Sequence, residues 1–349
     1  MWSLTTVRHV IPRPIRRAAS GWLAHRRSAR LQRDLALMVV RGAPVVAGPW
    51  LGEVGFELLY WVPFLRWCAA RLGIDPDRFI AISRGGTASW YAPFAARYVD
   101  VFDHVSAETF RDQHDSRVRD LGEQKQTRVT EFDRKLVDSA VRRAHGTDWS
   151  LLHPSRMYEL LNPYWWGHQS SEWVHRHATY ARLASPPPSG MPDLPARYVA
   201  VKFYFNDCFP ATAHNRAFVA DVLRSLTARG PVIALSTGLN IDDHGGVRVD
   251  EYGVRHLPEG LHPAHNLQVQ SALVAGAEAF VGTYGGFSYM APFYGVKSTA
   301  FYSDARGFSP KHLDMARSAF ERIGSAGLLD VRSTGSGPGA FDADTVLTR

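Results

Sequence analysis

The fold is decided by the stretch NLQVQSALVAGAEAFVGTYGGFSYMAPFYGVKSTAFYS, residues 266–303. Its first part, 266–276, is predominantly apolar and begins with Asn266, a residue type that favours helix N-caps, so it predicts a helix capped by that residue. The short apolar runs at 279–283 and 298–302 predict two buried strands. Gly285 and Gly286 follow the first of these strands and precede a second helix-like segment. This order of helix, strand, glycine turn, helix and strand indicates a parallel sheet in an α/β protein.

The same alternation continues towards both ends of the chain. Before the quoted stretch, 198–205 and 231–236 predict strands, with an amphipathic helix between them at 214–229. Earlier, 44–47, 78–83 and 98–105 predict strands, and 55–72 predicts a helix with a kink at Pro63. Residues 107–148 carry dense charges of both signs, which predicts a solvated pair of helices.

A proline-rich segment separates these two sets of elements. Five prolines fall between Pro186 and Pro195, the strongest boundary signal in the chain. We therefore expect two doubly wound α/β domains that face each other across a cleft, 41–184 and 197–332, joined by a linker at 185–196. A basic extension, 1–40, precedes them and a loose tail, 333–349, follows. Ligands of such sheets bind outside the carboxyl ends of the strands, so the loops after strands should hold the functional residues.

Composition and charge narrow the function classes. The 349 residues are 45% hydrophobic and 12% aromatic, which is typical of a soluble globular protein with room for two cores. The net charge of +7 is concentrated in the first 33 residues, which hold eight arginines and no acidic residue. The rest of the chain is close to neutral, which excludes a broad basic surface for nucleic acid. Cys68 and Cys208 are too few for a disulfide framework and are expected as buried thiols.

The basic leader has the pattern of an amphipathic helix. Its apolar residues interleave with arginines: Trp22, Leu23, Leu31, Leu35 and Met38 with Arg26, Arg27, Arg30 and Arg33. Such a helix is suited to an anionic membrane surface, and a solvated extension is the alternative. The chain lacks an apolar run of about 18 residues, so no transmembrane helix is expected. We therefore expect a cytoplasmic protein whose leader either contacts the inner face of a membrane or extends into solvent.

The first functional loop follows the strand at 44–47 and reads GPWLGEVGFE, residues 48–57. Its glycine spacing, G-x-x-x-G-x-x-G, differs from the dinucleotide fingerprint, and its two acidic residues disfavour a phosphate. Glu53 is instead predicted as the general base for a hydroxyl, with Glu57 as the second candidate. The alternative is that Glu53 only stabilises the start of its own helix.

The second functional loop follows the strand at 279–283. Its predicted ligand-binding residues are Thr283, Tyr284, Gly285, Gly286 and Ser288. Backbone N–H groups, hydroxyl groups and the positive end of a helix suit an anion such as a diphosphate. The alternative is a glycine turn that is needed only for close packing.

Further polar residues should lie at the same edge of the second sheet. Lys202 stands near the carboxyl end of an apolar strand, with Asn206 after it, and Thr237 and Gly238 close the next strand. A lysine in this position needs a carboxylate or a ligand phosphate as its partner. Asp242-Asp243-His244 lacks the spaced carboxylates of a metal-nucleotide site, so no metal or other cofactor is expected.

Residues 266–303, the glycine loop of the first half and the proline-rich linker together resemble GT-B-fold glycosyltransferases, distantly the heptosyltransferases. The resemblance implies two Rossmann-like domains, with the diphosphate of a nucleotide-sugar donor held by the loop at 283–288. This chain has Thr283-Tyr284-Gly285-Gly286 where the heptosyltransferases have an Asp-Ser-Gly-Pro run. The implied reaction transfers a sugar, without a metal, to a glycan or lipid-linked acceptor in bacterial surface polysaccharide or glycoconjugate synthesis.

The acceptor is expected at the first domain. The residues assigned to it are Gly52, Gly55, Trp50, Tyr164 and Trp165, whose aromatic rings would stack on sugars. Two other classes of protein remain open. The first is another enzyme on the same architecture, a pyruvyl transferase or an epimerase, and the second is a non-catalytic glycan-binding protein.

Overall fold

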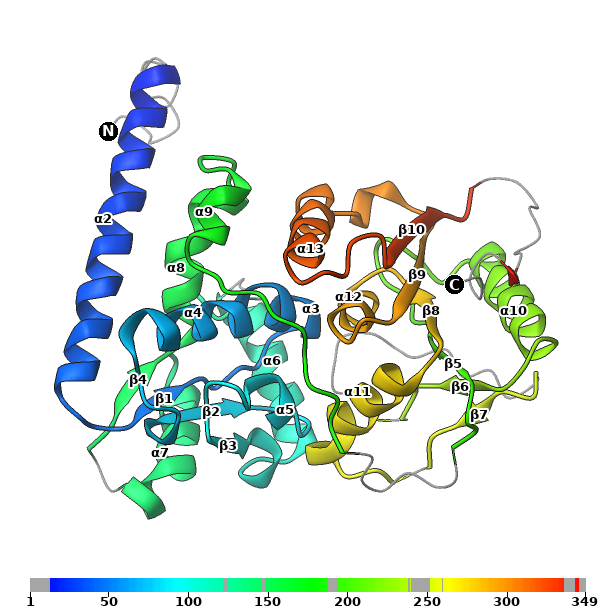
Figure 1. Ribbon diagram of the computed structural model, residues 1–349, viewed down its shortest axis with the longest axis horizontal. Helices are drawn as coiled ribbons and strands as arrows, with labels where there is room; N and C mark the ends of the chain where they lie inside the picture. The colour runs from blue at the N-terminus through cyan, green and yellow to red at the C-terminus, as the bar shows by residue number, and fades with distance from the viewer. Residues whose placement is uncertain are drawn as a thin grey trace.

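The computed structural model describes residues 13–121, 125–145, 148–187, 194–237, 239, 252–258, 260–335 and 343–344, without the side chains of 13–20, 120, 121 and 143–145. Two parallel sheets lie side by side (Figure 1). The predicted residue Gly238 and the Asp242-Asp243-His244 turn lie outside the described residues.

The first sheet has the strand order β3-β2-β1-β4, all parallel. Its strands are β1 (Val45–Ala47), β2 (Phe79–Ser83), β3 (Arg97–Asp100) and β4 (Ser150–Leu152). The chain moves outward from β1 to β3 and then crosses to the other side of β1, so the order reverses between β1 and β4. This reversal is the topological switch point of a doubly wound sheet.

Helices cover both faces of the first sheet. One apolar core lies against α2 (Arg13–Val40), α4 (Val62–Leu72) and α8 (Pro154–Trp165). A smaller core on the other face includes Ile80, Phe110 and Val137, the last two from α6 (Ala107–Leu121) and α7 (Glu131–His145). The helices α5 (Ala88–Tyr91) and α9 (Ser171–His175) complete this half. The helix pair predicted at 107–148 is confirmed, but it is not only solvated, because Phe110 and Val137 pack into this core.

The second sheet has the order β10-β9-β8-β5-β6-β7, again all parallel. Its strands are β5 (Val199–Lys202), β6 (Val232–Ala234), β7 (Arg255–His256), β8 (Ala279–Thr283), β9 (Lys297–Tyr302) and β10 (Leu329–Ser333). Its helices are α10 (Ala213–Thr227), α11 (Asn266–Gly276), α12 (Gly286–Phe293) and α13 (Pro310–Arg322). Counted from β5, this is the full six-strand Rossmann order, with its switch point between β5 and β8. The prediction of two Rossmann-like α/β sheets is confirmed.

Two local predictions need correction. The strand expected at 98–105 ends at Asp100, because the Asp100 carboxylate accepts the N–H of Phe102 at 2.9 Å and starts a 3-10 turn over 101–103. Asn266 is not the N-cap of α11 but its first residue. The N-cap is His265, whose side chain makes no capping hydrogen bond. The Asn266 side chain does not cap the helix because its oxygen accepts hydrogen bonds from Thr237 and Gln270.

The irregularity expected at Pro63 lies just before it. The helix begins as α3 (Val54–Phe56), widens into a π-helical segment over Glu57–Trp61, and continues as α4. The N–H of Val62 bonds the carbonyl of Glu57, which spans five residues instead of four. Proline lacks the N–H that a regular ladder needs, and π segments absorb such breaks, often near functional sites. This segment sets the directions in which Glu57 and Tyr60 point.

Candidate functional site

The switch point of the second sheet carries a chain of polar side chains. Lys202 ends β5 beside Gly282 of β8, and its Nζ donates a hydrogen bond to Gln270 Oε1 at 2.6 Å. The Gln270 amide donates to Asn266 Oδ1 at 2.7 Å, and Thr237 Oγ1 donates to the same oxygen at 2.8 Å. Gln270 and Asn266 stand four residues apart on α11 and so share one face. Two residues that the sequence assigned to the donor, Lys202 and Thr237, are thus joined through this face.

Lys202 brings a positive charge to this edge. The side chain is half-buried, and its ammonium group lies 3.5 Å from the ring centroid of Phe287. A cation over an aromatic face is attracted by the negative face of the ring. The groups at these two contacts, the Gln270 amide and the Phe287 ring, are both neutral. Such a lysine is suited to an anionic ligand.

Most polar side chains of the loop after β8 form hydrogen bonds within the fold. Thr283 is fully buried, and its Oγ1 donates to the Tyr204 carbonyl at 2.8 Å and accepts the Tyr204 N–H at 3.1 Å. Ser288 Oγ donates to the Gly285 carbonyl at 2.7 Å and accepts the Gly285 N–H at 3.2 Å, which closes the first turn of α12. The Tyr284 hydroxyl bonds that of Tyr289 at 2.6 Å, and burial raises the pKa of Tyr284 to about 12. These side chains fix the loop and its helix.

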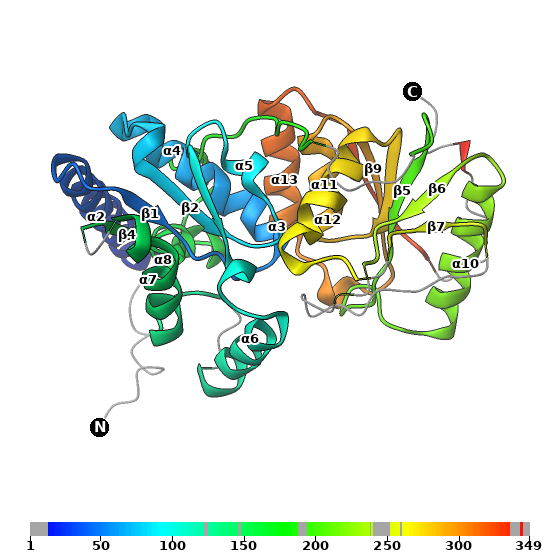
Figure 2. The same cartoon turned by 90° about the horizontal axis from the view of Figure 1, so that it is seen from below.

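The glycines of the two functional loops pack against each other. A Cβ on Gly286 would lie 2.6 Å from the Gly55 nitrogen, and one on Gly55 would lie 2.9 Å from the Gly286 Cα. Figure 2 shows α3 beside α12 at this contact between the two halves. The close packing that the sequence left as an alternative is therefore present, and it joins the first half to the second.

A second glycine contact lies next to the first. The Gly85-Gly86 turn follows β2, and the Gly85 carbonyl accepts the N–H of Gln268 in the first turn of α11 at 2.8 Å. A Cβ on Gly86 would lie 2.7 Å from the Ala264 carbonyl oxygen. The carboxyl ends of both sheets thus face each other, with glycines at both of these contacts.

The two predicted carboxylates differ in their surroundings. Glu53 has 53% of its side chain exposed and pairs with Lys125 at 2.8 Å. Glu57 is fully buried, where its Oε1 accepts hydrogen bonds from Ser83 Oγ and Tyr91 OH, each at 2.5 Å. Burial raises the pKa of Tyr91 well above its ordinary value, so it stays a donor. Glu53 therefore has the solvent access that a general base needs, whereas Glu57 is held in the core.

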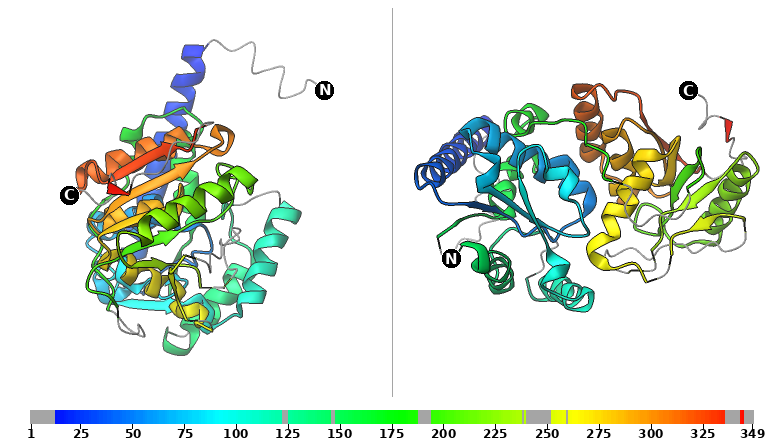
Figure 3. Two further views of the ribbon diagram at one scale, coloured as in Figure 1. Left: turned by 90° about the vertical axis from the view of Figure 1, so that its right-hand side faces the viewer. Right: turned by 60° about the horizontal axis from the view of Figure 1, so that its bottom comes forward.

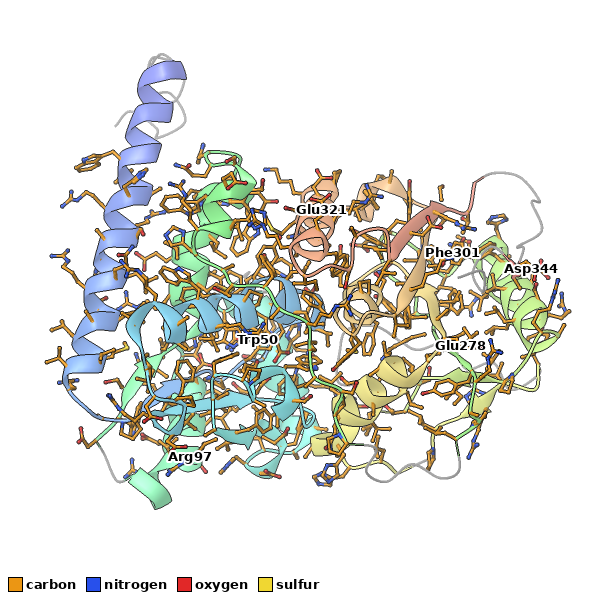
Figure 4. All side chains as sticks on the ribbon, in the orientation of Figure 1. Trp50, Arg97, Glu278, Phe301, Glu321 and Asp344 are labelled. Carbon is orange, nitrogen blue, oxygen red and sulfur yellow. The ribbon has the colours of Figure 1, made fainter. Side chains whose placement is uncertain are left out.

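Trp50 and Gly52, assigned to the acceptor, belong to the core of the first half. Trp50, labelled in Figure 4, is fully buried. Its ring stacks with those of Trp61 and Tyr158 at centroid distances of 5.7 and 6.3 Å. A Cβ on Gly52 would lie 3.0 Å from the Trp50 ring. Because its ring has no exposed face, Trp50 does not offer a stacking surface for a sugar in this structure.

The other aromatic candidates contact the second half. The Tyr164 hydroxyl donates to the Lys311 carbonyl at 2.9 Å, and the Trp165 ring meets the edge of Tyr60 at 5.2 Å. Phe56 lies 5.8 Å from Trp165, between centroids, and the Lys125 ammonium lies 3.6 Å above the Phe56 ring. An aromatic cluster thus stands next to the Glu53–Lys125 pair.

His312, at the start of α13, completes this cluster, and sequence reasoning missed it. Its Nδ1 shares a 2.7 Å hydrogen bond with the Tyr60 hydroxyl, and its ring lies 4.8 Å from that of Phe56. Burial, followed by the positive charge of Lys125, lowers the pKa of His312 to about 4, so the ring is neutral at pH 7. Its place just after β9, at the carboxyl edge of the sheet, is the signal that could have found it.

The remaining predicted residue, Asn206, shapes the turn after β5. Its Oδ1 accepts the N–H groups of Cys208 and Phe209 at 3.1 and 2.8 Å. Within the described ranges, no three His, Cys, Asp or Glu side chains gather as a metal site would require.

No protein-family model and no curated protein sequence matches this chain. Among solved structures it is similar to Escherichia coli ADP-heptose LPS heptosyltransferase II, with a TM-score of 0.46 at 12% identity over 85% of this chain and 92% of that one. It is also similar to the iron-containing dodecameric glycosyltransferase TibC of enterotoxigenic E. coli, with a TM-score of 0.41 at 10% identity.

The TibC match covers 74% of this chain and 58% of TibC, so this chain spans little more than half of that protein. UDP-GlcNAc 2-epimerase from Methanocaldococcus jannaschii matches with a TM-score of 0.31 at 8% identity over 84% of this chain and 89% of that one. The identities of all three matches are 12% or lower, and all three TM-scores lie below 0.5.

Proposed function

We propose that this protein is a GT-B-type glycosyltransferase that moves a sugar from a nucleotide-activated donor to a glycan or lipid-linked acceptor. The observation that carries the proposal is the position of Lys202 at the β5–β8 switch point. Lys202 donates a hydrogen bond to Gln270, and Gln270 and Thr237 both donate to Asn266. In doubly wound sheets, nucleotides bind outside the carboxyl ends of the strands at this point. A half-buried lysine with amides and a hydroxyl beside it suits the phosphates of such a donor.

The reaction breaks the bond between the sugar and the diphosphate, so negative charge develops on the leaving group. Lys202 would neutralise that charge, and a cation held in a half-buried site does so more effectively than one in water. We therefore propose that the diphosphate is held by lysine rather than by a metal. The Thr237 hydroxyl and the amides of Asn266 and Gln270 would orient the donor.

Glu53 would accept the proton of the attacking hydroxyl group. It stands two residues before Gly55, at the contact between the halves, with its carboxylate in solvent and paired with Lys125. A glycan or lipid-linked acceptor would approach from the first half, beside Phe56 and Trp165.

Donor binding at the loop after β8 would require the halves to separate. The space between Gly55 and Gly286 does not admit a methyl group, so it does not admit a phosphate. Opening of the two halves would uncover the N-terminus of α12, and closure would then exclude water from the activated donor.

The donor site is tested by thermal shift with UDP-, GDP-, ADP-, CMP- and dTDP-sugars. A ligand at about 100 times its Kd stabilises the native state by about 2.7 kcal/mol, which raises the Tm by several degrees. We expect one nucleotide class to shift the wild type and the control Lys135→Met, an exposed lysine of α7, but not Lys202→Met. Equal shifts in all three proteins would reject Lys202 as the phosphate ligand.

Product analysis then separates transfer from other chemistry on the same site. With the donor class identified, Glu53→Gln should lower sugar transfer about 10²- to 10⁴-fold while the thermal shift by the donor is kept. Release of an epimerised sugar nucleotide, or of no product at all, would replace the transferase assignment by an epimerase or by a glycan-binding protein.

A further inference from the structure

Helix α2 packs only one of its faces onto the first half. Ala24, Leu31 and Leu35 enter the core, and Ser28 Oγ bonds His177 Nε2 at 2.9 Å. Figure 3 shows the N-terminal turns of α2 extending beyond the body of the protein. Of the helices in the described part of the chain, none is both long and apolar enough to cross a bilayer.

The other face of α2 is both basic and apolar. Arg26, Arg30 and Arg33 are exposed on it, and so are four large apolar side chains: Trp22 at 57%, Leu23 at 47%, Leu37 at 63% and Val40 at 83%. The one acidic residue of the helix, Asp34, is paired with Arg156 of α8 at 3.1 Å. Arginines and exposed apolar residues therefore share this face without an exposed acid between them.

A second exposed tryptophan lies beside the same helix. Trp166 is 67% exposed in the turn between α8 and α9, and this turn touches α2, since a Cβ on Gly21 would lie 3.9 Å from Gln169 Nε2. Trp22 is held under the guanidinium of Arg26, 4.6 Å from the ring centroid. Because Gly21 lies on the opposite side of α2 from Arg30, this turn borders the helix away from its arginines. We call Trp22, Leu23, Arg26, Arg30 and Arg33 the α2 edge.

We propose that the α2 edge docks this protein on the surface of an anionic lipid bilayer. Its arginines match the negative charge of the headgroups, and its exposed tryptophan and leucine are side chains that enter the headgroup boundary. A nucleic acid would use the arginines but would leave Trp22 and Leu23 in water. The docking does not depend on the proposed reaction.

The orientation has one consequence that rests on the proposed function. Trp165 lies next to Trp166 in the chain, and its ring belongs to the aromatic cluster with Tyr60 and Phe56. Docking through the α2 edge would bring the first half, to which this cluster belongs, towards the surface that presents a lipid-linked acceptor (Figure 1). The second half would face away from the bilayer, towards the soluble donor.

The test is sedimentation of the full chain with vesicles of phosphatidylcholine, with and without about one third phosphatidylglycerol. Each arginine near an anionic surface changes partitioning about fivefold, so R26E/R30E/R33E should bind at least a hundredfold more weakly. The matched control R71E/R111E/R134E changes the net charge equally, on exposed arginines of α4, α6 and α7, and should bind like the wild type. Thermal melting checks that all the proteins are folded.

Three results would overturn the proposal. The first is equal binding of the wild type to neutral and anionic vesicles, and the second is an equal loss in the control variant. The third is tighter binding to a DNA duplex than to anionic vesicles at the same salt concentration. Trp22→Ala keeps all the arginines and so tests the contribution of the apolar side chain separately from charge. It should weaken binding to anionic vesicles.

Discussion

Gly286→Ala tests the contact that holds the two halves together. The added Cβ would lie 2.6 Å from the Gly55 nitrogen, and ordinary contact begins at 3.4 Å, so one loop must move by about 0.8 Å. Both sides of the contact are backbone and cannot yield by a side-chain rotation. Overpacking of this kind lowers the free energy of unfolding by about 1–3 kcal/mol.

Helix propensity acts in the opposite direction to the clash, so a loss of stability can be attributed to the clash. Replacing glycine by alanine within a helix stabilises by up to about 1 kcal/mol where space allows. Gly21 in α2 is the matched control, because its added Cβ would meet only Gln169 Nε2 at 3.9 Å. We expect Gly21→Ala to raise the unfolding free energy and Gly286→Ala to lower it.

Urea unfolding gives both free energies, and small-angle scattering reports whether the halves separate. Gly286→Ala should lower the unfolding free energy, increase the radius of gyration, or do both, since opening relieves the clash. If this variant has the radius of the wild type and is as stable as Gly21→Ala, the halves do not touch at this point, and the argument for an opening step is refuted.

Two further predictions concern buried groups. Tyr91→Phe removes a hydrogen bond to the buried Glu57 carboxylate and should lower the unfolding free energy by about 1.5–3 kcal/mol, measured by urea denaturation at pH 7; a change under about 0.5 kcal/mol would mean that this bond contributes little. Folding lowers the pKa of His312 to about 4, whereas the unfolded residue titrates near 6.5, so the unfolded chain takes up this proton first. The stability from neutral His312 is therefore complete above about pH 6.5 and is lost as the pH falls towards 4. His312→Gln should flatten this part of the pH profile, and an unchanged slope would show that other groups cause it.

Local sequence pattern was sufficient for most of the secondary structure. The segments 266–276 and 279–283 appear as α11 and β8 with the predicted bounds, because each is a predominantly apolar run with glycine at or near its end. Asn266 shows where local reasoning ends. Its residue type favours a cap, but its side-chain oxygen instead accepts hydrogen bonds from the Thr237 hydroxyl, 29 positions away, and from the Gln270 amide.

The candidate site depends on contacts that no local pattern encodes. Tyr60 and His312 stand 252 positions apart, and Lys125 and Glu53 stand 72 apart. Glu53 and Glu57 look equivalent in the sequence. The helix widens by one residue per turn at Glu57–Trp61, and the Glu57 carboxylate there is buried. The Glu53 carboxylate, before this segment, stays in solvent. The residue types were visible in the sequence, but their partners were not.

The two sheets share the same order over their first four strands, so both offer a switch point, and the side chains there distinguish the roles of the halves. After β4, His153 is buried and its Nδ1 accepts the N–H of Ser155, which commits the ring to the start of α8. After β1, the ionisable group in solvent is Glu53, which would repel a phosphate but accept a proton. After β5 stands Lys202, which would attract a phosphate. The sign of the charge at each switch point therefore supports the proposal that the donor binds to the second half and that the first half accepts the proton.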